Sequence, residues 1–80
     1  MAEVVTRAFI LVETQVGRAQ QVAHALRILQ GVRSADVITG TFDVIALIEA
    51  PDMGVMADLV TGRVQGIRGV LRTITCVAAG

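Results

Sequence analysis

The sequence predicts an α+β domain with the element order β-α-β-β-α-β, in which two helices cover one face of a four-stranded antiparallel sheet. Three observations support this prediction: runs rich in β-branched residues, two segments with helical periodicity, and an internal repeat. In the repeat, FILVE at residues 9–13 matches IALIE at 45–49, and QGVRSADV at 30–37 matches RGVLRTIT at 68–75. A duplicated unit of this kind is typical of the ferredoxin-like arrangement.

The first half of the chain begins with a strand and continues with an amphipathic helix. Residues 4–13 read VVTRAFILVE and are followed by the polar Thr14 and Gln15, which is typical of a strand and its end. Residues 18–30 have helical periodicity, and Gly31 is placed to cap the helix at its C-terminal end. The apolar stripe of this helix, with spacing i, i+3, i+4 and i+7, consists of Val22, Ala25, Leu26 and Leu29.

The next two elements form a predicted β-hairpin. Residues 32–39 and 42–49 are both β-prone, and the short connection between them contains Gly40 and Thr41. Pro51 ends the second of these strands because proline cannot donate a hydrogen bond to a sheet.

A second helix and a last strand complete the chain. Asp52 is placed to cap the helix, and residues 70–78 form the strand. Gly54 and Gly62 each cost about 1 kcal/mol relative to alanine, so this helix depends on packing for its stability. Its apolar stripe consists of Met56, Leu59, Val60 and Val64.

The chain is short for its apolar content. It has 80 residues, of which 54% are hydrophobic, and no linker divides it, so we expect one domain over residues 1–80. A domain of this size buries only about 60% of its surface on folding. The runs at residues 8–12 and 44–48 are apolar on both faces of their strands. We therefore expect the helix-free face to pack against a second copy, giving a dimeric α/β sandwich.

Composition and charge exclude several classes of protein. The longest apolar runs have five residues, whereas a membrane-spanning helix needs about 20, and no signal peptide is visible. The single Cys76 has neither a disulfide partner nor the spacing of a zinc site, so we expect a cytoplasmic protein without a cofactor. Seven arginines balance seven acidic residues and only two residues are aromatic, so direct binding to nucleic acid is not expected.

The sequence also lacks the usual combinations of catalytic residues. His24 has no acidic residue three or four positions away to orient it, and Cys76 has no neighbouring base, which favours a solvated helix residue and a packing residue. Glu13 and Glu49 occupy matching strand ends and are interpreted as edge or solvent-facing residues. We expect no catalytic residues and no enzyme activity.

Two polar segments are candidates for a binding site. TGTFD at residues 39–43 combines a turn glycine, two hydroxyls, an aromatic ring and a carboxylate, which are groups that suit the ammonium and carboxylate of a free amino acid. The composition alone favours the simpler alternative, a turn in which Asp43 bonds to local backbone. RTIT at residues 72–75 places Thr73 and Thr75 on one strand face, and cross-strand threonine pairing would explain them equally well.

With these motifs, the sequence resembles the effector-binding domain, or RAM module, of the Lrp/AsnC family of transcriptional regulators. The resemblance rests on TGTFDVIALIEA at residues 39–50 and IRGVLRTIT at 67–75 in combination, and it covers nearly the whole chain. It implies a βαββαβ module that binds a small amino acid effector, dimerises through its sheets, and assembles into an octamer or a similar ring. The ligand would lie between neighbouring dimers.

The resemblance also implies roles for individual residues. Asp43 would face the α-amino group of the effector, and the turn amides and threonine hydroxyls would face its α-carboxylate. Phe42 stands where the family often has Tyr or Trp, so a hydrogen bond from that ring is not available. The site nominated by motif position consists of Gly40, Thr41, Phe42, Asp43, Thr73 and Thr75.

Family regulators carry an N-terminal helix-turn-helix that this sequence lacks, so the resemblance implies a stand-alone form. Such a form would act by co-assembling with full-length relatives or by sensing amino acids in another complex, and a truncated piece of a larger regulator would give a similar sequence. Two alternatives from other classes are a dimeric ferredoxin-like enzyme of the monooxygenase or isomerase type, and a purely structural assembly module.

Overall fold

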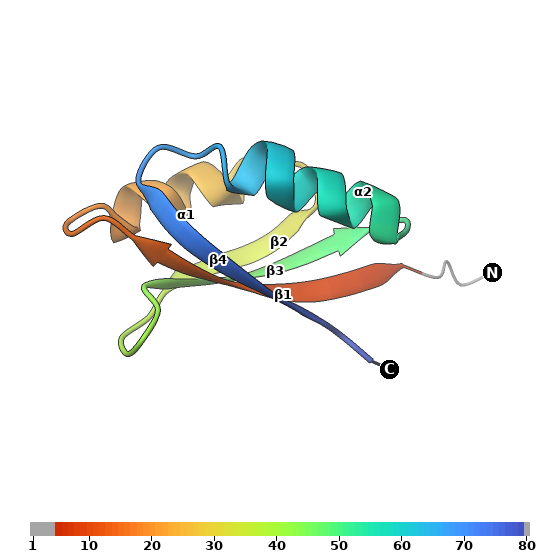
Figure 1. Cartoon of the computed structure of the whole chain (residues 1–80), viewed down its shortest axis with the longest axis horizontal. Helices are drawn as coiled ribbons and strands as arrows, with labels where there is room; N and C mark the ends of the chain where they lie inside the picture. Colours follow the sequence, from red (N-terminus) through yellow and green to blue (C-terminus); the bar gives the residue numbers. More distant parts are fainter. Residues whose placement is uncertain (1–4, 80) are drawn as a thin grey trace.

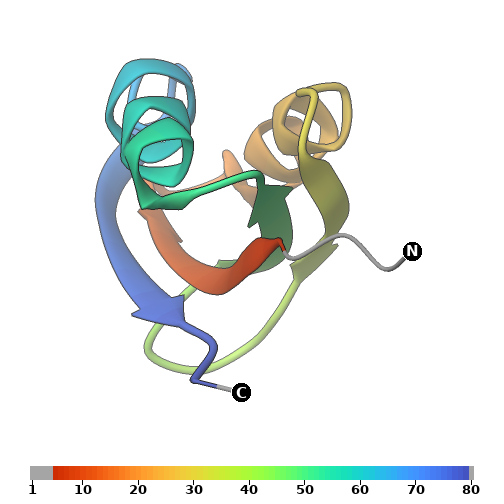
Figure 2. The same cartoon turned by 90° about the vertical axis from the view of Figure 1, so that its right-hand side faces the viewer.

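A four-stranded antiparallel sheet carries two helical segments on one face in the computed structural model, which describes residues 5–79 (Figures 1 and 2). The predicted element order and layers are confirmed, and the strand order in the sheet is β2-β3-β1-β4. The elements are β1 (Thr6–Thr14), α1 (Ala19–Arg27), β2 (Val32–Val37), β3 (Val44–Ala50), α2 (Met53–Asp58), the π-helical turn η1 (Leu59–Val64) and β4 (Val70–Val77). Residue 4 of the predicted first strand lies outside the described residues.

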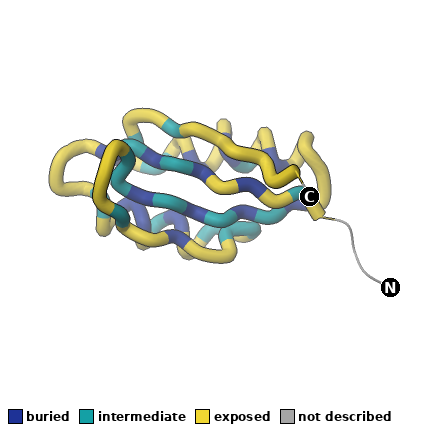
Figure 3. The backbone as a smooth tube through the Cα atoms, turned by 90° about the horizontal axis from the view of Figure 1, so that it is seen from below, coloured by how far each residue is buried: buried dark blue, intermediate teal, exposed yellow. Residues whose placement is uncertain are grey.

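The two central strands are buried on the face that the helices cover and partly exposed on the other face. β1 and β3 are paired from Thr6↔Ala50 to Val12↔Val44, so their alternate side chains form a continuous layer beneath the helices. This layer is fully or almost fully buried and consists of Ala8, Ile10, Val12, Val44, Ala46, Ile48 and Ala50. On the helix-free face, Phe9, Leu11, Ile45 and Leu47 retain exposure, as the alternating shades along the central strands in Figure 3 show.

The first helix is shorter than the sequence predicts. α1 ends at Arg27 rather than at residue 30, because the chain then turns tightly into β2 through Gly31, whose φ is +95°. A Cβ atom on Gly31 would lie 2.9 Å from the Glu49 carbonyl oxygen, so this turn approaches β3 more closely than any side chain permits. The buried stripe contains Val22, Ala23 and Leu26.

The predicted second helix consists of an α-helical part, α2, followed by a π-helical part, η1. α2 is capped as predicted, because the Asp52 carboxylate accepts a hydrogen bond from the Val55 N–H at 2.9 Å. From Leu59 the backbone widens into η1, where the Gln65 N–H donates to the Val60 carbonyl, a bond between residues five positions apart. None of the helices among the described residues is long and apolar enough to cross a membrane.

β4 is an edge strand that the helices leave largely uncovered. It pairs with β1 from Val70 to Val77, with a register shift between Glu13 and Thr14, and it curves away from the helical layer (Figure 2). Its side chains are therefore exposed or half-buried on both faces of the sheet.

Candidate functional site

The connection between β2 and β3 is longer than the predicted turn. The strand expected to begin at Phe42 begins at Val44, so residues 38–43 form the connection. Asp43 is bonded on two sides: its backbone N–H donates to the Val12 carbonyl of β1 at 2.9 Å, and its own carbonyl accepts the Ile38 N–H across the hairpin at 2.9 Å. These bonds hold the connection against the end of the central strand.

The Asp43 side chain reinforces the same attachment. Its Oδ2 atom accepts a hydrogen bond from the backbone N–H of Thr14 at 2.8 Å, across 29 positions in the sequence. The expectation that Asp43 bonds to local backbone is therefore wrong, because its partner is a residue of β1. The other carboxylate oxygen, Oδ1, has no hydrogen-bond partner among residues 5–79, and the side chain is only half-buried. This oxygen is available to a cation.

The tip of the connection presents open backbone amides. Gly40 has φ of +130°, which favours glycine, and space for a Cβ there is empty within 4 Å. Gly40 and Thr41 are exposed, and within the described part of the chain the N–H groups of Gly40, Thr41 and Phe42 donate no hydrogen bond. Such amides are donors suited to an anionic group.

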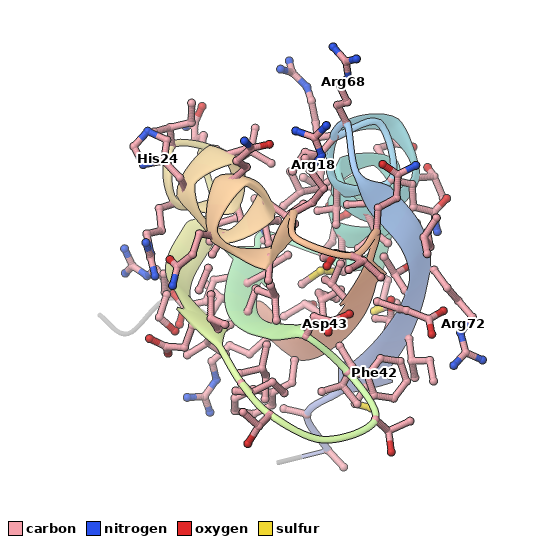
Figure 4. The ribbon with its side chains drawn as sticks, turned by 90° about the vertical axis from the view of Figure 1, so that its left-hand side faces the viewer. Arg18, His24, Phe42, Asp43, Arg68 and Arg72 are labelled. Carbon is pink, nitrogen blue, oxygen red and sulfur yellow. The ribbon has the colours of Figure 1, made fainter. Side chains whose placement is uncertain are left out.

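Phe42 lies apart from the predicted threonines. The Arg72 guanidinium stands over its ring at 5.3 Å from the ring centroid, and Arg72 also pairs with Glu13 at 3.6 Å. Arg72 and Glu13 are opposite each other on the helix-free face, and Figure 4 shows Phe42 beside Arg72. Thr73 faces the helix side of β4. Phe42 therefore lies on the helix-free face with Arg72 and not on the side of the threonines.

The two threonines share one face of β4, as the sequence predicts. Thr73 stands opposite Val12 and Thr75 opposite Ile10, so both are on the helix side of the sheet. Thr73 is half-buried and Thr75 is exposed. The Gln65 side chain at the end of η1 reaches Thr73, and its Nε2 donates to the Thr73 Oγ1 at 3.0 Å. Gln65 was not predicted, because periodicity alone treats it as one more polar residue of a helix.

Within one protomer Asp43 and the threonines are on opposite sides of β1. Val12 accepts the Asp43 N–H on one side and pairs with Thr73 on the other. Two strand spacings separate these neighbours, which is about 10 Å. No hydrogen bond among the described residues joins the two groups, so the structure brings Thr73 and Thr75 together but leaves Asp43 apart from them.

The remaining reactive groups have ordinary surroundings. His24 is exposed, as expected. Cys76 is exposed on the helix-free face, so the expectation of a packed cysteine is wrong within a single protomer, because β4 is an edge strand. Glu13 and Glu49 pair with arginines rather than with each other. Residues 5–79 contain no group of three His, Cys, Asp or Glu side chains that could hold a metal ion.

An open cleft of about 710 Å³ lies at the other end of the sheet from the hairpin connection. It contains the Arg33–Glu49 ion pair, whose atoms are 2.7 Å apart, together with Asp58 and Arg63. None of the six predicted site residues lines it. Arg18 and Arg68 project from the helical side, also apart from Asp43 (Figure 4).

The four-stranded sheet with two helical segments on one face, and the polar connection between β2 and β3, form the arrangement that the sequence resemblance implies. The sequence matches the family described as the Lrp/AsnC ligand binding domain over residues 7–79. This protein therefore belongs to that family of regulatory modules, which agrees with the resemblance carried by the TGTFD and RTIT motifs. No curated protein sequence matches the chain significantly.

Solved structures agree with this assignment. TTHA0845 from Thermus thermophilus is 31% identical, with a TM-score of 0.88, and the match covers 94% of each chain. The hypothetical protein PHS023 from Pyrococcus horikoshii is 26% identical with a TM-score of 0.87, covering 92% of this chain and 89% of that one. The regulator NMB0573 from Neisseria meningitidis, solved as a complex with L-Met, is 22% identical with a TM-score of 0.83. That match covers 94% of this chain and 50% of the regulator, and it shows the shared fold.

Proposed function

We propose that this chain is an amino-acid-binding regulatory module whose assembly responds to a small amino acid effector and thereby modulates transcription. The observation that carries the proposal is the hairpin connection, where the Asp43 Oδ1 and the open amides of residues 40–42 belong to one short segment. A carboxylate oxygen suits the α-amino group of a free amino acid, and free N–H donors suit its α-carboxylate. The L-Met bound to the Neisseria meningitidis regulator supports the same class of ligand.

The proposed effector site draws on more than one protomer. Asp43 and Thr73 lie on opposite sides of β1, where the buried Val12 pairs with Val44 on one side and with Thr73 on the other. In this proposal the threonine hydroxyls that contact an effector at one hairpin come from a neighbouring chain. This arrangement makes occupancy of the site dependent on assembly, and it gives the effector a means of changing assembly.

The helix-free face supplies the first step of assembly. Phe9 is 45% exposed and stands between Leu47 and Cys76, at the middle of an apolar surface. We infer that two copies pack these faces together around a two-fold axis, and that such dimers associate further into an octamer or a similar ring. The Neisseria meningitidis regulator contains the same fold in about half of its chain, so co-assembly with a full-length regulator of this kind would connect the module to DNA.

Calorimetric titration with each of the twenty L-amino acids tests the effector. We expect at least one to bind, and we expect Asp43→Asn to weaken that binding at least tenfold, because the neutral amide keeps an acceptor for the Thr14 N–H but loses its charge. Asp58→Asn, on the exposed face of α2, is the matched control and should bind like the original protein. Absence of binding across the panel would overturn the proposal.

Sedimentation velocity with and without the bound amino acid tests the assembly. We expect species larger than a dimer whose proportion changes when the effector is added. A dimer that never forms larger species and ignores every amino acid would instead indicate a structural assembly module.

A further inference from the structure

We propose that Gln65 is a positioning residue of the effector site, which sets the Thr73 hydroxyl to donate a hydrogen bond to the carboxylate of the ligand. The inference rests on the proposed function and adds to it a residue that belongs to neither motif. Its basis is the hydrogen bond from Gln65 Nε2 to Thr73 Oγ1, at 3.0 Å.

The π-helical turn brings Gln65 to this position. The Gln65 N–H donates to the Val60 carbonyl, and Thr61 Oγ1 donates to the Ala57 carbonyl at 2.8 Å, so the last turn is fixed by two bonds. A wider turn of this kind changes the direction in which the next residue leaves the helix, and π-helical turns are frequent at functional sites. Here the residue that leaves is Gln65, and it meets the polar face of β4.

The contact determines whether the Thr73 hydroxyl donates or accepts a hydrogen bond. A threonine hydroxyl has one proton to donate and two lone pairs to accept, whereas an amide NH₂ group can only donate. Because Gln65 Nε2 is the donor, Thr73 Oγ1 is the acceptor, and the Thr73 proton is free to point elsewhere. A ligand carboxylate accepts hydrogen bonds and is the matching partner for that proton.

The position of the pair argues for a role in binding rather than in stability. Gln65 is exposed, so water competes for its amide and the bond adds little to folding. Thr73 is half-buried at the edge of the sheet, with Thr75 exposed on the same face two residues further. Together these groups form a polar strip on the helix side of β4, open to a neighbouring chain.

The test compares each amino acid that binds with its carboxamide, in which the carboxylate is replaced by a neutral amide. The original protein should prefer the acid. In Gln65→Glu, the new carboxylate accepts the hydrogen bond of the Thr73 hydroxyl and repels the ligand carboxylate. Affinity for the acid should therefore fall at least tenfold, while affinity for the carboxamide should change less than threefold. Gln65→Met, which cannot form hydrogen bonds of this kind, should show an intermediate loss. Gln20→Glu on the exposed face of α1 is the matched control.

A double-mutant cycle separates positioning from direct contact. If Gln65 acts through Thr73, the loss caused by Gln65→Met should disappear in a Thr73→Val background. Equal losses for acid and carboxamide, or a loss that persists without the Thr73 hydroxyl, would overturn the inference while leaving the proposed function intact. A chain that binds no amino acid at all would overturn both.

Discussion

The Asp43 carboxylate accepts the backbone N–H of Thr14 at 2.8 Å, and this bond fastens the hairpin connection to the end of the central strand β1. Thr14 is buried, so its N–H has no water to replace that partner. One oxygen of Asp43 thus maintains the fold, and the other has no hydrogen-bond partner among residues 5–79. The two roles can be separated by substitution.

Asp43→Ala should lower the free energy of unfolding by about 1 to 3 kcal/mol, because it leaves a buried donor unpaired. Asp43→Asn should cost less than about 1 kcal/mol, since its side-chain carbonyl still accepts the bond. Urea unfolding at one fixed protein concentration measures both. Equal losses for the two variants would mean that the bond to Thr14 does not stabilise the fold.

Gly31→Ala should destabilise the protein more than Gly17→Ala. Both glycines have positive φ, +95° and +80°, which costs an L-residue about 1 to 2 kcal/mol. Only at Gly31 would the new Cβ also meet a backbone atom, the Glu49 carbonyl oxygen at 2.9 Å, whereas the space at Gly17 is open. Overpacking adds about 1 to 3 kcal/mol, which thermal unfolding of the two variants should reveal. A smaller loss at Gly31 would contradict the close approach to β3.

Phe9→Glu should dissociate the proposed dimer. The substitution places a charge between Leu47 and Cys76 on the helix-free face, and it occurs twice in a symmetric dimer, so the dimer dissociation constant should rise at least about a hundredfold. Val16→Glu, at a fully exposed loop position, is the control. Analytical ultracentrifugation over a dilution series measures the change, and an unaltered dimer would place the interface elsewhere.

Asp52→Ala should remove the cap of α2 and cost about 1 kcal/mol. The Asp52 side chain accepts the Val55 N–H, whereas the Asp58 side chain, at the other end of α2, caps no helix among the described residues, so Asp58→Ala should be close to neutral. Chemical denaturation compares the pair. If both variants lose the same stability, the cap is not responsible.

Alternation and repetition in the sequence predicted the sheet because those signals depend on neighbouring residues. Ile10 and Val12 alternate with Phe9 and Leu11, and the structure buries the first pair and leaves the second partly exposed. The cap at Asp52 was also predictable, since capping is a local interaction.

Long-range contacts explain what the sequence did not predict. The start of β3 was placed two residues early because the backbone N–H and the side chain of Asp43 both bond to β1, which is distant in the sequence. The π-helical turn has the same apolar spacing as an α-helix, so the contact of Gln65 with Thr73 carries no signal in the periodicity. The predicted site residues are present as two groups, which no hydrogen bond among the described residues joins within one protomer.

The internal repeat acquires a further meaning in three dimensions. Gly31 and Gly69, with φ of +95° and +99°, begin the two edge strands in the same way. In each central strand the residue before the last is a glutamate, and it pairs with an arginine of the adjacent edge strand, Glu49 with Arg33 and Glu13 with Arg72. The halves of the molecule are therefore alike where they build the sheet. They differ at the hairpin connection, which exists once, and at the π-helical turn, which only the second half contains within the described residues. The proposed hairpin site and Gln65 lie at the places where this pseudo-symmetry is broken, so a chain made of two identical halves should keep the scaffold and lose the proposed site.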